Sequence, residues 1–406
     1  MAVTGTVAGR PQPQTTAEPA GGPFIRHAPD GRRAMYVATP GTVQNPQFIA
    51  NPMVSSPGWN KGYRVQALVA DGTSTAVGVV NIDAPWNYFQ LVQLKDAFGT
   101  QLITGPGFDT AFLLQLYGQQ FGTDEVVSPQ NLPSFAPIHV PAGVGAEGGF
   151  NLTTYLPFEF AKGYGTISGA NAALLPVLQI NTSIFSTMIT GSTYSAYPSA
   201  TSVTVDADFY WLPNVASDPP GIGTTQQWIY QPCNPPIPSG GSQLVQLPRL
   251  GGYLSTIILD LRDANGVRAE SNTTTNFGWP VRPKLLVDGV PLIDSLFSTL
   301  QEDLAIALQV GTLNNSPAAS TSTTNQGTPQ AARPLGTMAI SRKTSMAQRA
   351  LGLLDTGEVF PSTNPGTQIE VAGFPWGAVI AAPMILNALV GQIVPSGALV
   401  RGLPEA

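Results

Sequence analysis

Residues 88–99 read Tyr88-Phe-Gln-Leu-Val-Gln-Leu-Lys95-Asp96-Ala97-Phe98-Gly99, an apolar run that is closed by a turn. Ten residues later, Asp109-Thr-Ala-Phe112 opens a segment in which Leu113, Leu116 and Tyr117 recur at helical spacing. The pattern predicts a strand, a turn and then a helix that runs to about Phe121, with Asp109 as its N-cap.

Both motifs occur a second time, in the same order. Residues 253–266 read Tyr253-Leu-Ser-Thr-Ile-Ile-Leu-Asp-Leu-Arg262-Asp263-Ala264-Asn265-Gly266, which repeats Leu-(Lys/Arg)-Asp-Ala-x-Gly. Asp294-Ser-Leu-Phe297 follows as a second helix start, and Leu296, Leu300, Leu304 and Leu308 form one stripe. Two motifs repeated in order indicate a duplicated β-domain with one helix in each copy.

The composition favours β-structure. The 406 residues have room for two domains of ordinary size. Charged residues make up only 10%, against roughly 25% in typical soluble domains. The 43 glycines and 38 prolines suit short strands joined by many turns. A surface of uncharged polar groups indicates that much of it faces other protein, although a secreted β-rich protein would share this composition.

Charge and cysteine content exclude several classes of function. A net charge of −6 gives no global basic field, so specific nucleic-acid recognition is not expected. Cys233 is the single cysteine, and no intrachain disulfide can form. The start, Met1-Ala-Val-Thr-Gly5, lacks a basic segment followed by an apolar one, so no secretory signal is expected.

Changes in composition predict four segments. Residues 1–60 form an extended arm, which is either a flexible tail or a segment that orders against a neighbouring subunit, a membrane or packaged nucleic acid. Residues 61–212 form the first β-domain, and the proline-rich residues 213–242 form a linker in which Gln227-Trp-Ile-Tyr230 could pair as a short strand. Residues 243–406 form the second domain and a C-terminal tail. The arm is mildly basic, with Arg10, Arg26, Arg32 and Arg33.

Several local patterns predict further elements. Asp71-Gly72 and Asp288-Gly289 are hairpin turns by composition. The charge-free stretch 371–400 is broken by prolines and glycines, which favours two or three buried strands over a membrane helix. Strands are also expected at 150–160, 174–180 and 202–211, and long loops at 122–149 and 311–334, which should emerge at one end of the molecule.

Three candidate sites have weak support. Gly143-Val-Gly145-Ala-Glu-Gly148 matches GxGxxG, but a strand-like segment follows it, which predicts a loop and not a dinucleotide site. His27 and His139 are the only histidines and lie far apart in the sequence, which removes a histidine metal site and argues against a Ser-His-Asp triad. Cys233 has no nearby base and is expected to be an inert thiol.

The acidic candidates are also explained without chemistry. Asp206 and Asp208 share one face of a strand, as do Asp260 and Arg262, and a polar outer face accounts for both pairs better than glycoside hydrolysis or calcium binding. The repeated Asp96 and Asp263 stand at turn positions, where Asp is structurally useful. The sequence therefore predicts no catalytic, cofactor-binding or metal-binding residue, no cofactor, and no enzyme.

The chain resembles the double jelly-roll major capsid proteins of tailless, membrane-containing double-stranded DNA phages, the tectivirus-like group. The resemblance covers roughly residues 60–400. It is carried by both copies of the two motifs and by the closing stretch Leu354-Asp355-Thr356…Pro365-Gly366-Thr367…Ile393-Val-Pro395-Ser-Gly397.

The resemblance implies an all-β chain with two tandem eight-stranded antiparallel jelly rolls, each with one flanking α-helix. It also implies a homotrimer that tiles as a pseudo-hexamer in an icosahedral virion shell, made in the host cytoplasm before assembly. The implied partners are neighbouring capsomers, a penton or minor capsid protein and an internal membrane. Two rival functions stay open: a phage spike or receptor-binding β-protein, and, with less support, a secreted carbohydrate-active β-sandwich protein.

Overall fold

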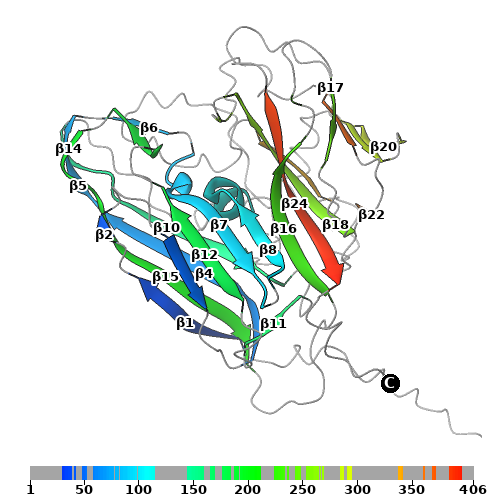
Figure 1. The fold of residues 1–406 in the computed structure, drawn as a ribbon, viewed down its shortest axis with the longest axis horizontal. Helices are drawn as coiled ribbons and strands as arrows, with labels where there is room; N and C mark the ends of the chain where they lie inside the picture. Colours follow the sequence, from blue (N-terminus) through cyan, green and yellow to red (C-terminus); the bar gives the residue numbers. More distant parts are fainter. Residues whose placement is uncertain are drawn as a thin grey trace, which may run out of the picture.

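The computed structural model describes about half of the chain, mostly as strands. The described residues are 30–38, 41–42, 48–52, 58–76, 78–81, 83–97, 99–114, 144–159, 165–169, 176–183, 187–191, 193–211, 224–233, 236, 243–247, 253–264, 266, 268, 284–287, 290–294, 337–341, 360–361, 368–371 and 384–395. Below, the first half means the described residues up to 211, and the second half means those from 224 onward. The first half and the second half lie side by side (Figure 1).

One layer of the first half is a twisted antiparallel sheet. Its strands lie in the order β1 (Asp30–Ala38), β15 (Ser199–Tyr210), β4 (Trp59–Ala70) and β10 (Phe150–Pro157). The short strands β2 (Gly41–Thr42) and β11 (Ile167–Ser168) pair with β15 and β4. Inward residues such as Tyr63, Val65 and Ala67 are buried and alternate with more exposed ones, as a sheet with one buried face requires.

The second layer runs through both halves as one sheet. In the first half it contains β8 (Gln101–Gly105), β7 (Phe89–Lys95), β12 (Val177–Thr182) and β3 (Phe48–Pro52). In the second half it contains β21 (Thr337–Ser341), β18 (Tyr253–Arg262), β24 (Ile385–Pro395) and β16 (Thr224–Pro232), with β22 (Phe360–Pro361) paired to β18. The described part of the chain is thus nearly all β, in several sheets, as a double jelly roll would be.

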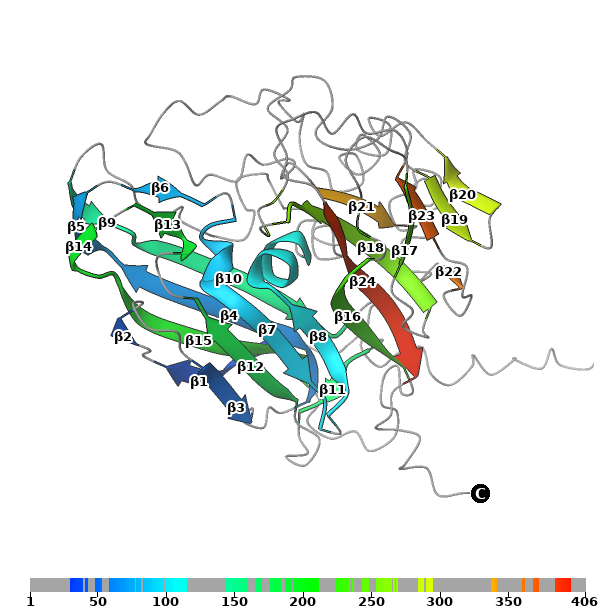
Figure 2. The ribbon, with the colours of Figure 1, turned by 45° about the horizontal axis from the view of Figure 1, so that its top comes forward.

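Smaller elements complete the described part. One small sheet has the order β14 (Thr193–Ala196), β5 (Gly72–Ala76) and β9 (Gly145–Glu147). Another has the order β17 (Gln243–Gln246), β23 (Gln368–Val371), β19 (Lys284–Val287) and β20 (Val290–Asp294). β6 (Val79–Val80) pairs with β13 (Ile189–Thr190), and η2 (Trp86–Tyr88) and the π-helix η3 (Phe108–Leu113) stand beside β7 and β8 (Figure 2).

Of the two predicted hairpin turns, one is right and one is wrong. Val287 pairs with Val290 across Asp288-Gly289, which confirms a two-residue hairpin between β19 and β20. At Asp71-Gly72 the chain goes straight on, because β5 pairs with β14 and β9 and not with β4. The Asp71 carboxylate accepts a hydrogen bond from the Gly149 amide at 2.7 Å, which ties this break in β4–β5 to the break between β9 and β10.

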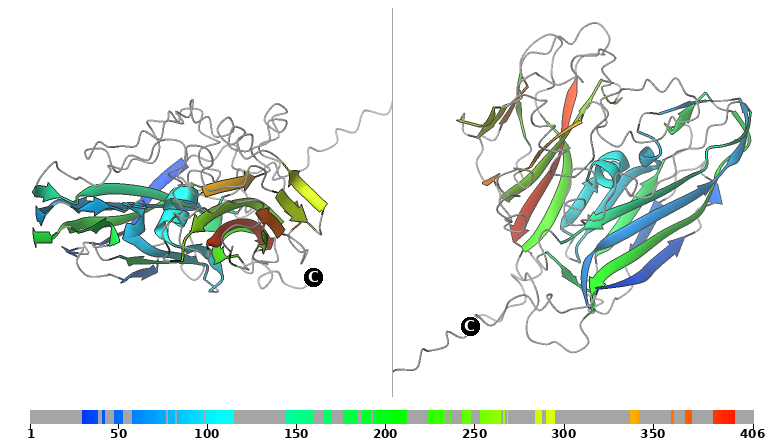
Figure 3. Two further views of the ribbon diagram at one scale, coloured as in Figure 1. Left: turned by 90° about the horizontal axis from the view of Figure 1, so that it is seen from above. Right: turned by 180° about the vertical axis from the view of Figure 1, so that it is seen from behind.

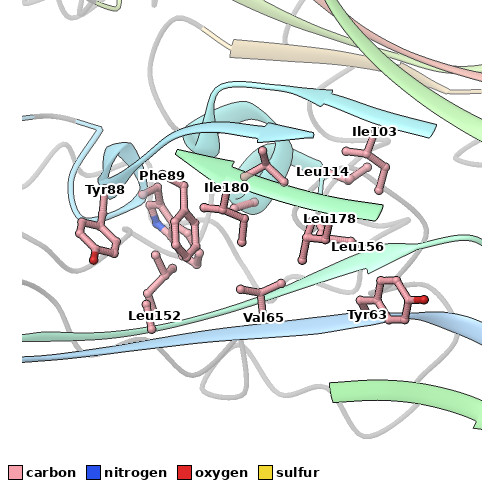
Figure 4. Packing of buried hydrophobic residues seen from close by; sticks show 14 of the residues in the cluster. Tyr63, Val65, Tyr88, Phe89, Ile103, Leu114, Leu152, Leu156, Leu178 and Ile180 are labelled. Atoms are coloured by element: carbon pink, nitrogen blue, oxygen red, sulfur yellow. The ribbon is translucent and has the colours of Figure 1, made fainter. Parts of the chain in front are cut away.

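The core of the first half continues into the second half. Side chains of β4 and β10 pack against side chains of β7, β12 and η3 (Figure 4), with Tyr63, Phe89 and Ile180 fully buried. The same apolar cluster includes Trp228, Ile258 and Leu389 of the second half. Seen from above, the layers of the two halves stand next to each other (Figure 3).

The predicted arm contains strands that belong to the sheets. β1 lies at the edge of one sheet, beside β15, and β3 lies at the edge of the other, beside β12. Met35 of β1 is buried in the core. Residues 1–29 lie outside the described residues.

The remaining predicted elements have mixed outcomes. Expected strands at 150–160, 174–180 and 202–211 are present as β10, β12 and β15. In the stretch 371–400, residues 385–395 form the strand β24, and no helix among the described residues is long and apolar enough to cross a membrane. The second predicted helix from residue 295, the loop 311–334 and most of the loop 122–149 lie outside the described residues.

Candidate functional site

The two halves meet along a parallel pair of strands, β8 and β16. Trp228 lies opposite Ile103, and Ile229 lies opposite Thr104. Gly105 at the end of β8 allows this approach, because a Cβ there would lie 2.7 Å from Tyr230 Cβ and 2.9 Å from Thr110 Cγ2. We call this junction, with the charged groups described next, the seam.

Five charged side chains from both halves lie together in the seam, four of them buried and Arg262 half-buried. Arg262 of β18 donates from Nη1 to Asp83 Oδ2 at 2.7 Å and from Nε to Asp260 Oδ2 at 2.5 Å. Arg268 donates from Nε to Asp83 Oδ1 at 2.8 Å and stacks 4.6 Å from the ring centre of Phe108. Both oxygens of Asp83 are therefore ion-paired, one to each guanidinium.

Asp109 is the exception in this network. It lies in η3, its side chain is 1% exposed, and neither of its oxygens has a hydrogen-bond partner. The nearest cationic atom is Arg262 Nη2, at 3.7 Å from Oδ2. Asp260 also leaves one oxygen, Oδ1, without a hydrogen bond. Three carboxyl groups thus face two guanidinium groups, away from water.

Burial and neighbouring charge separate the proton affinities of these acids. Burial raises the pKa of Asp109 well above its ordinary value, and the nearby Asp260 raises it further. Burial also raises the pKa of Asp260, to about 6, although Arg262 opposes the shift. For Asp83, burial acts in the same direction, but Arg268 and Arg262 together outweigh it and lower the pKa.

The repeated motif forms the same turn in both halves. In the first copy, the Gly99 amide donates to the Asp96 carbonyl at 3.1 Å, and Lys95 pairs with Gln101. In the second, the Gly266 amide donates to the Asp263 carbonyl at 3.0 Å, and Arg262 pairs with Arg268.

Both glycines have positive φ, 84° and 78°, which explains why the motif ends in Gly. The Asp96 carboxylate also accepts from the Thr100 amide at 2.7 Å. The turn role predicted for Asp96 and Asp263 is thus confirmed.

The prediction that Asp260 and Arg262 lie on a polar outer face is wrong. Asp260 is buried and the side chain of Arg262 is only 14% exposed, because β18 is covered on both faces at this point, where Ile257, Ile258 and Leu259 are also buried. Asp109 was predicted to cap a helix, but Gly107 occupies the N-cap position and Asp109 points into the seam. The sequence offered one sign of this burial, the unbroken apolar run before Asp260.

Asp206 and Asp208 do lie on one face of β15. Asp208 accepts from Arg32 Nε of β1 at 2.6 Å and from Arg64 Nη2 of β4 at 3.3 Å. Asp208 thus links β15 to both neighbouring strands, β1 and β4, and Arg32 is engaged within its own chain.

The structure describes two of the remaining candidates, the glycine motif and Cys233. Gly145 and Gly148 lie in and after β9, which leads into the strand β10 and not into a helix. Cys233 is buried, and burial raises the pKa of its thiol to about 12. His27 and His139 lie outside the described residues. Among the residues that the structure describes, no group of three or more His, Cys, Asp or Glu side chains could hold a metal ion.

No family model matches the sequence, and no curated protein matches it. Solved structures do match. The STIV major capsid protein aligns with a TM-score of 0.55 at 14% identity, over 92% of this chain and 100% of that chain.

A chain from the atomic structure of Sulfolobus turreted icosahedral virus aligns with a TM-score of 0.56 at 14% identity, over 92% of this chain and 94% of that chain. A chain of the PBCV-1 virus capsid gives 0.51 at 11% identity, over 91% and 94%. The resemblance to double jelly-roll major capsid proteins is therefore confirmed at the level of the fold.

Proposed function

We propose that this chain is a major capsid protein, the structural building block of an icosahedral virion shell, and that it has no enzymatic activity. The observation that carries the proposal is the extent of the likeness, because 92% of this chain aligns with the whole of the STIV major capsid protein. A likeness over both chains concerns the complete arrangement of two halves, and not one common β-sandwich.

The seam supports a mechanical role. A wall unit must keep its two barrels in a fixed relation, and the shared sheet, the shared core and the buried ion network join the halves at three levels. The low content of charged residues also fits, since the cores of protein interfaces are depleted of charge.

The finer parts of the proposal follow from the resemblance. Two eight-stranded jelly rolls, each with a flanking helix, would be built on residues 61–212 and 243–406, with β1 and β3 added to the first roll and β16, from the segment 213–242 that joins them, added to the second. Three chains would form a pseudo-hexameric homotrimer that contacts neighbouring capsomers, a penton or minor capsid protein and an internal membrane of a phage. The protein would reach the shell from the host cytoplasm. The basic residues of the arm, and not the resemblance, suggest that Arg26, Arg32 and Arg33 face an anionic interior. Because Arg32 is paired with Asp208, that role would fall mainly to residues 1–29, with Arg26.

Electron microscopy of the purified full-length protein, together with its mass in solution, tests this function. We expect compact pseudo-hexagonal particles with three times the 42.5 kDa mass of one chain. Elongated particles with a fibre or knob would instead indicate a spike, and a stable monomer that binds glycans would indicate a carbohydrate-active protein.

Deletion of residues 1–29 tests the arm separately from the fold. This cut leaves β1 and β3 in place, so the shortened chain should fold and form trimers but give fewer shells. A truncated protein that assembles with normal yield would show that the arm is dispensable.

A further inference from the structure

The described groups around Asp109 form a closed set of charges. The charges that interact electrostatically with the Asp109 carboxyl group are those of Asp83, Asp260, Arg262 and Arg268. Tyr230 of β16 faces the same cluster. The other elements packed against η3 carry three further titratable groups: Tyr88 in η2, Lys95 at the end of β7 and Tyr155 on β10. β8 carries none.

Counting the charges shows which group holds a proton. Asp83 is ionised, because it receives 2.7 Å and 2.8 Å bonds from two guanidiniums. Asp260 has one such bond, and Asp109 has none. If all three were ionised, the seam would hold one uncompensated negative charge away from water, which is a costly arrangement. Protonation of Asp109 removes that charge.

We propose that Asp109 works as a proton-controlled lock between the two halves. With the proton bound, the seam is neutral and closed. When the proton leaves, as the pH rises from acid toward neutral or alkaline values, the extra buried charge favours states in which η3 moves away from β16 and β18 and water reaches the carboxylates.

The direction of the pH dependence follows from proton binding. The closed seam binds the proton more tightly than an open one, in which both acids return to their ordinary value near 3.8. The contribution to stability is therefore complete below that value and is lost as the pH rises through the pKa values of the closed state. Asp83 acts oppositely, and its contribution is lost only as the pH falls below 3.8.

Hydrogen exchange of the full-length wild-type protein, measured at pH 5 and pH 8 and corrected for intrinsic rates, tests the lock. Amides of β8 and β16 should open more often at pH 8 than at pH 5, by about tenfold for each unit by which the pKa in the closed seam lies above 5. Amides of β4 and β15, away from the seam, provide the internal reference. Equal changes in both pairs of strands would overturn the proposal without any variant.

The variant Asp109→Asn provides the second test, because an amide side chain of the same shape cannot ionise. The variant should keep only the pH dependence that Asp260 contributes near pH 6, so its seam protection should change less between pH 5 and pH 8 than that of the wild type. The control Asp206→Asn, on the outer face of β15, should behave as the wild type does. A pH profile of Asp109→Asn parallel to that of the wild type would exclude Asp109 as the group responsible. Neither measurement depends on shell assembly, so the lock and the capsid function stand or fall separately.

Discussion

Lys95 and Arg262 occupy the same place in the repeated motif but have opposite surroundings. Each ends a strand, precedes an Asp, and pairs with the residue six positions later across a turn closed by a positive-φ glycine. Lys95 is half-buried and no carboxylate contact is described for it, whereas Arg262 contacts three carboxylates. The motif therefore specifies the turn, and the position of each half specifies whether that turn is a surface feature or part of a joint.

Arg262→Ala should have the largest effect. It removes one of two cations from the seam and leaves Asp83 and Asp260 short of compensation, a change that typically costs about 3–5 kcal/mol. Lys95→Ala, the matched control in the other copy, should change the free energy of unfolding by less than about 0.5 kcal/mol. Urea denaturation of both variants measures the difference. Similar losses would mean that the two positions are energetically equivalent, contrary to the contacts.

Gly105→Ala should have the second largest effect and lower the free energy of unfolding by about 1–3 kcal/mol. The added Cβ would overlap Tyr230 and Thr110 where β8 meets β16. Exchange of the Trp228 and Ile229 amides should quicken as that pairing loosens. If Gly105→Ala unfolds at the wild-type midpoint, the approach of the halves is less tight than the distances require.

Gly99→Ala and Gly266→Ala compare the two turns directly. Both glycines have positive φ, and an added Cβ at either would meet nothing within 4 Å. The cost is then backbone strain alone, about 1–2 kcal/mol, and should be equal in both variants. Thermal unfolding compares them. A clear difference would show that the turns are not equivalent despite the shared motif.

Arg32→Ala should have the smallest effect. The side chain of Arg32 is 55% exposed, so its ion pair with Asp208 is screened and is worth less than about 1 kcal/mol. The loss should fall further in high salt, unlike that of Arg262→Ala. A salt-independent loss above 2 kcal/mol would mean that β1 depends on this pair far more than its exposure allows.

The sequence predicted well whatever was local. The Asp288-Gly289 hairpin, the turn roles of Asp96 and Asp263, and the strand at 202–211 all depend on neighbours within a few residues. Asp71-Gly72 failed although it has hairpin composition, because the partner of the Asp71 carboxylate is the distant Gly149.

Elements with remote partners were the hardest to predict. β16 lies in the proline-rich segment read as a linker, yet it pairs with β24 and β8 as an inner strand of the longest sheet. β1 and β3 lie in the segment read as an arm, and their partners β15 and β12 follow more than a hundred residues later. The seam depends on both halves at once, so Asp109 and Arg262 could not be matched from spacing alone.

The pairing of β16 with β24 has a consequence for synthesis on the ribosome. β16 ends at Pro232 and β24 begins at Ile385, so at about 5–20 residues per second the first strand waits roughly 10–30 s for its neighbour. During that interval β8, already made, is the available partner for β16. During synthesis β16 thus pairs first with the already folded first half. In chains stalled before residue 385, β16 should therefore already protect β8 from proteolysis.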